Sequence, residues 1–316
     1  MEHTILLTGA SGFVGQNIIA HFPNARFVVY EHRSKVPPSE NIICRIASFD
    51  DDFPSCDVWI NLAGKAHDVS KVQSDDAYVE ANVLFTQKVF RAFQAHEGAK
   101  LFFQLSSVKA IADDPTTPID ETSLENPKTI YGQTKLQADR FLQDASINDH
   151  QRVIIIRPAM IYGPGNKGNL NALFSYCKSG LPYILARYNG ERSYLSIYNL
   201  MHILQECMAD GSIPSGIYCA SDRDSVLTND LVKWIYLVLD QKSRLIKVPK
   251  FIIGVLAFLG DYLPIPINSD TLKKIGTDYI VHSNKIQNLL KTPLPIASHE
   301  GLKSTLRHFK QMHPHS

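Results

Sequence analysis

The stretch Ile5-Leu6-Leu7-Thr8-Gly9-Ala10-Ser11-Gly12-Phe13-Val14-Gly15 decides the fold. It passes from an apolar run, typical of a buried strand, through a glycine-rich loop into the start of a helix. Gly9 permits a tight turn, Gly12 lets the backbone approach a phosphate, and Gly15 lets the helix pack against the strand. The free amides at the helix start attract anions. The stretch therefore predicts a dinucleotide-binding site, and a purely structural turn is the alternative.

Four further apolar runs, at residues 27–30, 58–62, 101–105 and 153–156, have the composition of buried strands. They are continuous and rich in β-branched and aromatic residues, as in a parallel sheet covered on both faces. Apolar residues spaced three and four apart predict helices over 78–93 and 130–145. This alternation predicts an α/β fold with a doubly wound parallel sheet of the Rossmann type.

The alternation of apolar runs and helical patterns is interrupted at the turn-rich residues 163–168 (Gly-Pro-Gly-Asn-Lys-Gly). Shorter elements with scattered prolines follow this break. We therefore assign residues 1–165 to the dinucleotide-binding domain. Residues 166–316 are expected to form mainly a smaller C-terminal lobe that binds substrate, with the possibility that some segments return to the sheet.

Composition excludes several classes of protein. Lys and Arg total 32 and Asp and Glu total 31, giving a net charge of +1, and 44% of the residues are hydrophobic. Such a chain lacks the basic excess of a nucleic-acid-binding surface and the polarity of a disordered protein. Five cysteines without CxxC spacing indicate neither a disulfide framework nor a metal site. No apolar run approaches the roughly 20 residues of a membrane span, and no signal peptide is evident. We expect a cytoplasmic protein without membrane insertion.

An acidic residue near the end of the second strand bears on the choice of cofactor. Glu31 lies 22 residues after Gly9, close to the spacing of carboxylates that hold the adenosine ribose hydroxyls. A carboxylate there repels a 2′-phosphate and favours NAD. Arg33 follows it, and a guanidinium at that place would accommodate NADP. The cofactor is therefore predicted to be NAD or NADP, with a solvated charged turn as the alternative for Glu31.

Tyr131 and Lys135 stand four residues apart in Tyr131-Gly132-Gln133-Thr134-Lys135, which places both on one face of a helix. A neighbouring ammonium favours the phenolate, so we expect a pKa for Tyr131 below its usual value of about 10. The phenol could then exchange a proton with a substrate hydroxyl while the cofactor exchanges a hydride. Ser106 and Ser107 end the strand 101–105, on the ligand side of such sheets. Tyr131 taken alone could equally be an ordinary helix-surface residue.

In this order the motifs resemble the extended short-chain dehydrogenase/reductases that act on nucleotide sugars, the NAD-dependent epimerase/dehydratase family. The shared motifs are the glycine loop, Asn61-Leu62-Ala63-Gly64, Asn82, Ser106-Ser107, residues 131–135, Arg157-Pro158 and residues 162–165. The resemblance implies that Ser107, Tyr131 and Lys135 are catalytic, with a contribution from Ser106. It implies, with the reasoning above, cofactor contacts at Gly9, Ser11, Gly12, Phe13, Val14, Gly15, Glu31, Arg33, Leu62, Ala63, Lys65, Asn82, Tyr131 and Lys135.

Two C-terminal segments resemble the substrate-binding segments of this family. Residues 168–170 and 190–194 resemble the segments that hold the nucleoside diphosphate of a UDP-sugar. Arg192 is the candidate for a diphosphate clamp because guanidinium groups match phosphate oxygens, and a surface salt bridge is the alternative. Ser107, Asn169 and His67 are further candidate substrate contacts, with a loop histidine as the alternative for His67.

Departures from the family pattern narrow the expected reaction. Val108 and Lys109 occupy the places of the Asp-Glu pair that performs elimination in 4,6-dehydratases, which leaves redox chemistry at one carbon. Ser48 stands where the family often has an Asp that meets the adenine, and Met160 stands where many epimerases have an Asn. Residues 105–109 and Lys65-Ala66-His67 instead resemble 4-ketoreductases that make 6-deoxy sugars for surface polysaccharides.

We therefore expect an NAD(P)-dependent 4-ketoreductase acting on a UDP-hexosamine type of sugar. A UDP-sugar 4-epimerase with tightly bound NAD is the alternative. A non-catalytic NAD(P)-binding sensor or scaffold is the alternative from another class.

The resemblance also implies a homodimer. In this family the helices near 78–95 and 131–147 pair across a two-fold axis. Apolar residues of the first helix would supply that interface, and an intramolecular core is the alternative for them: Phe85, Val89, Phe90 and Phe93.

Overall fold

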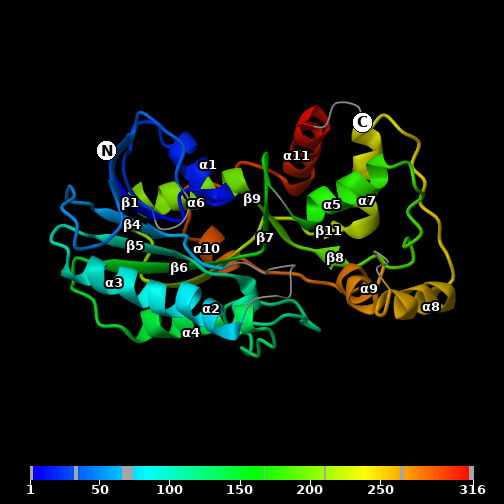
Figure 1. Ribbon diagram of the computed structural model, residues 1–316, viewed down its shortest axis with the longest axis horizontal. Coiled ribbons are helices and arrows are strands. Elements are labelled where there is room, and N and C mark those ends of the chain that lie inside the picture. Colours follow the sequence, from blue (N-terminus) through cyan, green and yellow to red (C-terminus); the bar gives the residue numbers. More distant parts are fainter. Residues whose placement is uncertain are drawn as a thin grey trace.

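A seven-stranded sheet organises the larger of two bodies (Figure 1). A computed structural model gives the structure of the protein and describes residues 3–31, 35–65, 74–166, 168–209, 211–263 and 267–312. Every neighbouring pair of strands is parallel. In sheet order the strands are β10 (Gly216–Ala220), β6 (Arg152–Pro158), β5 (Leu101–Leu105), β4 (Val58–Asn61), β1 (Thr4–Thr8), β2 (Arg26–Tyr30) and β3 (Ile42–Ile46).

The predicted doubly wound sheet is confirmed. The five predicted strands correspond to β1, β2, β4, β5 and β6; β5 has the predicted bounds, and those of the others differ by at most two residues at either end. The strand order reverses between β1 and β4, where ligands bind in folds of this class. The glycine loop follows β1 and therefore lies at this switch point.

Helices cover both faces of the sheet. α1 (Phe13–His21) and α6 (Ile197–Ala209) pack on the face that buries Ile5 and Leu7. α3 (Phe85–Ala95) and α4 (Ile130–Asp144) pack on the face that buries Leu6. Adjacent residues of β1 thus enter opposite cores, which explains why this strand is a continuous apolar run.

The apolar residues that suggested a dimer lie inside this fold. Val89, Phe90 and Phe93 are at most 1% exposed, and they pack with Trp59 and Phe102 against the sheet. Phe85 is partly buried against the same core. The intramolecular alternative therefore accounts for all four residues, and the homodimer stays a prediction without their support.

The helix predicted over 78–93 contains a wider turn. It consists of α2 (Asp75–Tyr78), a π-helical segment η1 (Val79–Leu84) and α3. Such π-helical turns occur frequently at functional sites. This one carries the buried Asn82, which faces the loop after β4.

The smaller body is built around a second core that includes Phe174, Val232 and Ile235 (Figure 1). Its short strand pairs are β7–β9 and β8–β11. The bounds are α5 (Asn169–Lys178), α7 (Thr228–Val238), α8 (Lys250–Gly260), α9 (Ser269–Gly276), α11 (Ser298–Met312), β7 (Met160–Tyr162), β8 (Glu191–Arg192), β9 (Tyr194–Ser196) and β11 (Val226–Leu227).

The chain crosses between the two bodies more than once. α6 and β10, both beyond residue 165, belong to the larger body, and α10 (Asn284–Gln287) packs against β10. The larger body therefore extends beyond residues 1–165. Among the described residues, none of the helices combines the length and apolarity needed to cross a membrane.

Candidate active site

The glycine loop is shaped by close backbone contacts. Gly9 has φ +68°, and a Cβ added there would lie 2.9 Å from the Ala63 amide nitrogen. A Cβ on Gly15 would lie 2.5 Å from the Gly9 carbonyl oxygen. The Gly12 amide donates to that carbonyl at 3.0 Å, which closes the turn. Side chains are thus excluded at Gly9 and Gly15 by geometry, as the loop prediction requires.

The start of α1 suits a diphosphate. Gly12 is the N-cap, and within the described residues no side chain caps this helix. Its first turn, Phe13–Gln16, carries no acidic residue. The first amides of a helix have no intrahelical partner and lie at its positive end. The arrangement of Ser11, Phe13 and Val14 around this helix start therefore fits the pyrophosphate of a dinucleotide.

Glu31 directly follows β2. Its Oε1 accepts a hydrogen bond from the Val36 amide at 2.9 Å and also pairs with the Arg45 guanidinium. The Val36 bond and Arg45 lower the pKa of Glu31, so its carboxylate stays ionised. An ionised carboxylate here fits the ribose hydroxyls of NAD. Arg33 lies outside the described residues.

A buried polar network joins the carboxyl ends of the central strands. Thr8 donates through Oγ1 to Asn61 Oδ1 at 2.5 Å, and Asn61 Nδ2 donates to Gln104 Oε1 at 2.8 Å. The Ala63 amide donates to Thr8 Oγ1 at 3.1 Å. These bonds hold Leu62 and Ala63 against the glycine loop, where both were predicted to line the cofactor.

Asn82 connects this loop to the predicted catalytic helix. Its Oδ1 accepts from the Lys65 amide at 2.7 Å, and its Nδ2 donates to Thr134 Oγ1 at 3.0 Å. A Cβ on Gly64 would lie 2.8 Å from Asn82 Oδ1 and 3.1 Å from Lys135 Nζ. Through these two hydrogen bonds, Asn82 links the loop at residues 61–65 to α4.

Tyr131 lies in the first turn of α4, next to Ser107. The helix begins at the N-cap Thr129, whose Oγ1 accepts from the Gly132 amide at 3.2 Å. Ser107 caps the short 3₁₀ helix η2 (Val108–Ala110), accepting from the Lys109 amide, and its hydroxyl lies near the Tyr131 phenol. The structure therefore brings together the phenol and the hydroxyl that were predicted to act on one oxygen atom.

The predicted pKa of Tyr131 is wrong for this structure. Burial raises its pKa, and the nearby Ser107 hydroxyl only partly offsets this effect. Lys135 is itself 5% exposed and donates through Nζ to the Leu105 carbonyl oxygen at 3.1 Å. Burial lowers the pKa of Lys135 to about 8. Loss of hydration therefore outweighs the pairwise attraction on which the prediction relied.

Ser106 has a different partner from Ser107. Its hydroxyl donates to Asp139 Oδ2 at 2.8 Å, and the same oxygen accepts from Arg157 Nε at 2.8 Å. Arg157 also donates through Nη2 to Glu125 Oε1 at 2.6 Å. Sequence reasoning missed Asp139, although it follows Lys135 by one further helical turn. This buried network joins the middle of α4 to the end of β5 and to β6.

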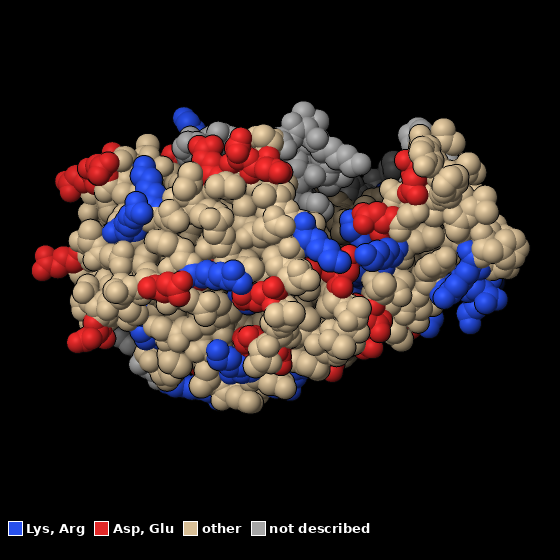
Figure 2. All heavy atoms as spheres, turned by 90° about the horizontal axis from the view of Figure 1, so that it is seen from below, with Lys and Arg blue, Asp and Glu red and all other residues tan. Residues whose placement is uncertain are grey.

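Arg192 and Lys109 gather on the substrate side. The Lys109 Nζ lies 4.8 Å from the centre of the Tyr279 ring, and the Arg192 guanidinium carbon lies 6.0 Å from it. Arg192 donates to the Lys274 carbonyl. Lys109 Nζ donates to the Asp113 carbonyl at 2.5 Å. Figure 2 shows charged side chains of both signs gathered where the two bodies meet.

Lys109 was noticed in the sequence only as a departure from the dehydratase pattern. Burial lowers its pKa, the nearby Asp113 and Asp114 raise it, and Arg192 and Lys274 lower it further. An anion bound beside Tyr279 would relieve this repulsion between cations. Asn169 begins α5 in the smaller body with its side chain exposed, and His67 lies outside the described residues.

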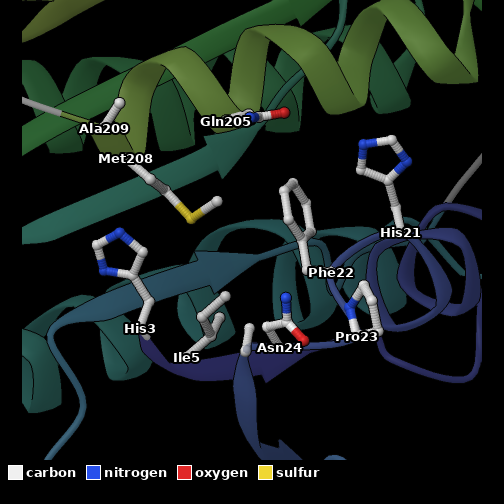
Figure 3. Close-up of a pocket in the computed structure, with 10 residues that line it drawn as sticks. His3, Ile5, His21, Phe22, Pro23, Asn24, Gln205, Met208 and Ala209 are labelled. Atoms are coloured by element: carbon white, nitrogen blue, oxygen red, sulfur yellow. The ribbon is translucent and has the colours of Figure 1, made fainter. Parts of the chain in front are cut away.

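A pocket of about 380 Å³ lies at the other end of β1 (Figure 3). His3, Phe22 and Met208 line it; they lie just before β1, just after α1 and in α6. It contains none of the predicted site residues and opens at the amino ends of the strands. Ligands of doubly wound sheets bind at the carboxyl ends, so this pocket is separate from the candidate site.

Comparison with known proteins agrees with the site geometry. Residues 5–254 match the model of the NAD dependent epimerase/dehydratase family. The chain belongs to that family. Within it, a UDP-glucose 4-epimerase of Vibrio cholerae is 25% identical, covering 98% of this chain and 97% of the relative. An N-acetyl-alpha-D-glucosaminyl-diphospho-ditrans,octacis-undecaprenol 4-epimerase of Escherichia coli O157:H7 is 26% identical, covering 92% and 87%.

Solved structures show the same fold as this member of the epimerase/dehydratase family. The Bordetella bronchiseptica enzyme WbmG in complex with NAD and UDP superposes with a TM-score of 0.76. The alignment covers 98% of this chain and 95% of WbmG at 16% identity. The family is NAD-dependent, and the uncapped α1, the glycine loop and the ionised Glu31 fit that cofactor.

Proposed function

We propose that this protein oxidises or reduces C4 of the sugar of a UDP-sugar, with Tyr131 as the acid and base. The observation that carries the proposal is the half-buried Tyr131 phenol, next to the Ser107 hydroxyl and one helical turn from Lys135. This group lies at the carboxyl end of β5, beside the loops that fit NAD. The names of the two full-length relatives, both 4-epimerases, support chemistry at C4.

NAD, when bound, supplies the hydride acceptor and donor. Tyr131 Oη takes the proton of the sugar hydroxyl during oxidation and returns it during reduction, a role that typically contributes about 10²–10⁴-fold. Ser107 donates to the same sugar oxygen and limits its movement. Lys135 places a cation near the phenol, which stabilises the phenolate that forms. Burial lowers its pKa to about 8, which is still above neutral pH, so most of Lys135 stays protonated there.

Arg192 and Lys109 are proposed to hold the diphosphate of the substrate. The two relatives act, by their names, on a sugar carried by UDP and on a sugar carried by an undecaprenol diphosphate. What these substrates share is a sugar attached to a diphosphate. Two cations beside one aromatic ring match that shared group.

Within C4 chemistry we propose the 4-ketoreductase of a UDP-hexosamine type of sugar. The proposal rests on residues 105–109, which place Lys109 where a dehydratase needs a carboxylate, and on their resemblance to ketoreductases. A 4-epimerase is the second candidate, because both full-length relatives carry that name. A GDP-6-deoxy-D-mannose reductase of Pseudomonas aeruginosa matches only 53% of this chain.

The nucleotide retained by the purified protein should distinguish the 4-ketoreductase from the 4-epimerase. A ketoreductase releases its oxidised cofactor in every cycle, so the denatured protein should yield little nucleotide. It should also consume NADH or NADPH when a UDP-4-keto sugar is added. Stoichiometric NAD in the denatured sample, together with interconversion of C4 epimers, would contradict the ketoreductase and establish the epimerase. Chromatography of the released nucleotide provides the measurement.

Replacing Arg192 with methionine should weaken substrate binding more than chemistry. A hydrogen bond to a charged group contributes about 1.5–3 kcal/mol, so we expect KM for the UDP-sugar to rise roughly 10–100-fold. The change in kcat should be smaller. Steady-state kinetics test this, with Arg187→Met as the matched control because Arg187 is an exposed arginine of the same body. An equal KM in both variants would exclude the clamp.

A further inference from the structure

α8 presents an apolar face to solvent. Phe251 is 74% exposed, Val255 and Phe258 are each 59% exposed, and Tyr262 just after the helix is 78% exposed. Their spacing of four, three and four residues places them in one stripe. Three further exposed residues lie beside this stripe and complete the α8 apolar face: Ile252, Leu259 and Leu263.

The opposite side of α8 is already packed. Ile253 and Ala257 are at most 1% exposed and belong to the core of the smaller body. The apolar residues of the outer side are therefore not needed to attach the helix. Single exposed apolar residues are ordinary, but a contiguous group of this kind marks an interaction surface.

The chain around this face is strongly cationic. Residues 241–260 contain four cations and no acidic residue, whereas the whole chain has a net charge of +1. All four cations are exposed: Lys242, Arg244, Lys247 and Lys250. Figure 2 shows Lys and Arg grouped at the outer end of the smaller body, next to uncharged surface. Two acids flank this stretch: Asp240 pairs with Lys310, and Asp261 accepts from the neutral Ser269 hydroxyl and keeps its charge.

We propose that the α8 apolar face binds the surface of an anionic lipid bilayer. Apolar side chains that enter the interface and cations that meet anionic headgroups are the two components of such binding. α8 has 11 residues, and at about 1.5 Å per residue it is too short to span a bilayer. The helix therefore lies in the interface and does not cross it.

Charge favours this occupant over a second copy of the chain. A symmetric dimer through the same face would bring two identical surfaces together. The four cations of each copy would then lie near those of the other copy. No acidic residue in 241–260 could compensate for them. An anionic bilayer supplies the missing negative charge.

The proposed surface is structurally connected to the candidate site. α9 packs on α8, and the Lys274 carbonyl in α9 accepts from Arg192. A pocket between the two helices, about 380 Å³, is lined in part by Lys250, Gly254 and Lys273. A bilayer beneath α8 would thus lie one helix away from the diphosphate clamp. This consequence rests on the proposed function, whereas bilayer binding does not.

Vesicle sedimentation tests the proposal with the full chain. We expect binding to phosphatidylcholine vesicles that contain phosphatidylglycerol, weak binding to phosphatidylcholine alone, and a bound fraction that falls with added salt. Phe251→Ser with Phe258→Ser, and separately Lys242→Ser with Lys247→Ser, should each weaken binding at least about tenfold. Leu124→Ser is the matched control, since Leu124 is 87% exposed and lies outside this face.

Three results would overturn the proposal. The first is that the wild-type protein does not bind the anionic vesicles, and the second is that Leu124→Ser loses as much vesicle binding as the other variants. The third is that the wild-type protein is a dimer that binds no vesicles and that Phe251→Ser with Phe258→Ser converts to monomers. Thermal unfolding curves should show that all variants remain folded, because every replaced side chain is exposed. Their turnover of a water-soluble UDP-sugar should be unchanged. If no UDP-sugar is turned over, the proposed function fails while the vesicle result still stands.

Discussion

Replacing Tyr131 with phenylalanine is expected to lower kcat for the UDP-sugar by at least about 10²–10⁴-fold, the usual contribution of an acid–base group. The variant loses one hydroxyl and keeps the ring that packs in the first turn of α4. Ser107 keeps its position as the N-cap of η2, where it accepts from the Lys109 amide. NAD binding should therefore stay within a few-fold of wild type, because the glycine loop and Glu31 are untouched.

Turnover of a panel of UDP-sugars and calorimetric titration with NAD measure the two effects separately. Tyr198→Phe is a suitable control, since Tyr198 is 43% exposed in α6 and belongs to no predicted site. Wild-type-like turnover by Tyr131→Phe would remove Tyr131 from the mechanism. A wild-type protein that binds NAD(P) tightly and turns over no sugar would instead favour the non-catalytic sensor or scaffold.

Sequence reasoning identified the strands that are buried on both faces. β1, β2, β4, β5 and β6 are continuous apolar runs, because each contributes side chains to two cores. β3 was missed because it lies at the sheet edge, where Ile43 and Arg45 are exposed. β10 was missed because it returns from the C-terminal half, and no local pattern shows that a later segment joins an earlier sheet.

Sequence reasoning predicted those parts of the candidate site in which the spacing along the chain sets which residues lie together. Tyr131 and Lys135 share a helix face for that reason, and the glycine positions follow from a single turn. The raised pKa of Tyr131 was not predictable, because burial depends on the segments that cover the side chain. The approach of Lys109 and Arg192 to one ring joins distant parts of the chain, and only the folded structure reveals it.

Replacing Arg157 with methionine is expected to lower the free energy of unfolding by about 3–5 kcal/mol, the usual cost of leaving a buried charge without its partner. Arg157 is 1% exposed and bonds to both Asp139 and Glu125. Asp139 is fully buried, and within the described residues its Oδ1 has no hydrogen-bond partner. Without the guanidinium, the Ser106 hydroxyl is the one group among the described residues that would still bond to that carboxylate.

Arg140 offers a matched comparison on the same carboxylate. Arg140 also donates to Glu125, at 3.1 Å, but its side chain is 60% exposed. Exposed ion pairs contribute at most about 1 kcal/mol, so Arg140→Met should unfold at nearly the wild-type urea concentration. Equal losses in the two variants would show that burial does not set the strength of this network.

A double variant distinguishes the loss of the Arg157–Asp139 ion pair from the cost of leaving the Asp139 carboxylate buried without a partner. Asp139→Leu combined with Arg157→Met replaces both buried charges with apolar groups of similar size. If the cost of Arg157→Met comes from the uncompensated Asp139 carboxylate, the double variant should recover much of the lost stability. A double variant less stable than Arg157→Met alone would mean that Asp139 contributes mainly through Ser106, whose hydroxyl it holds at the end of β5.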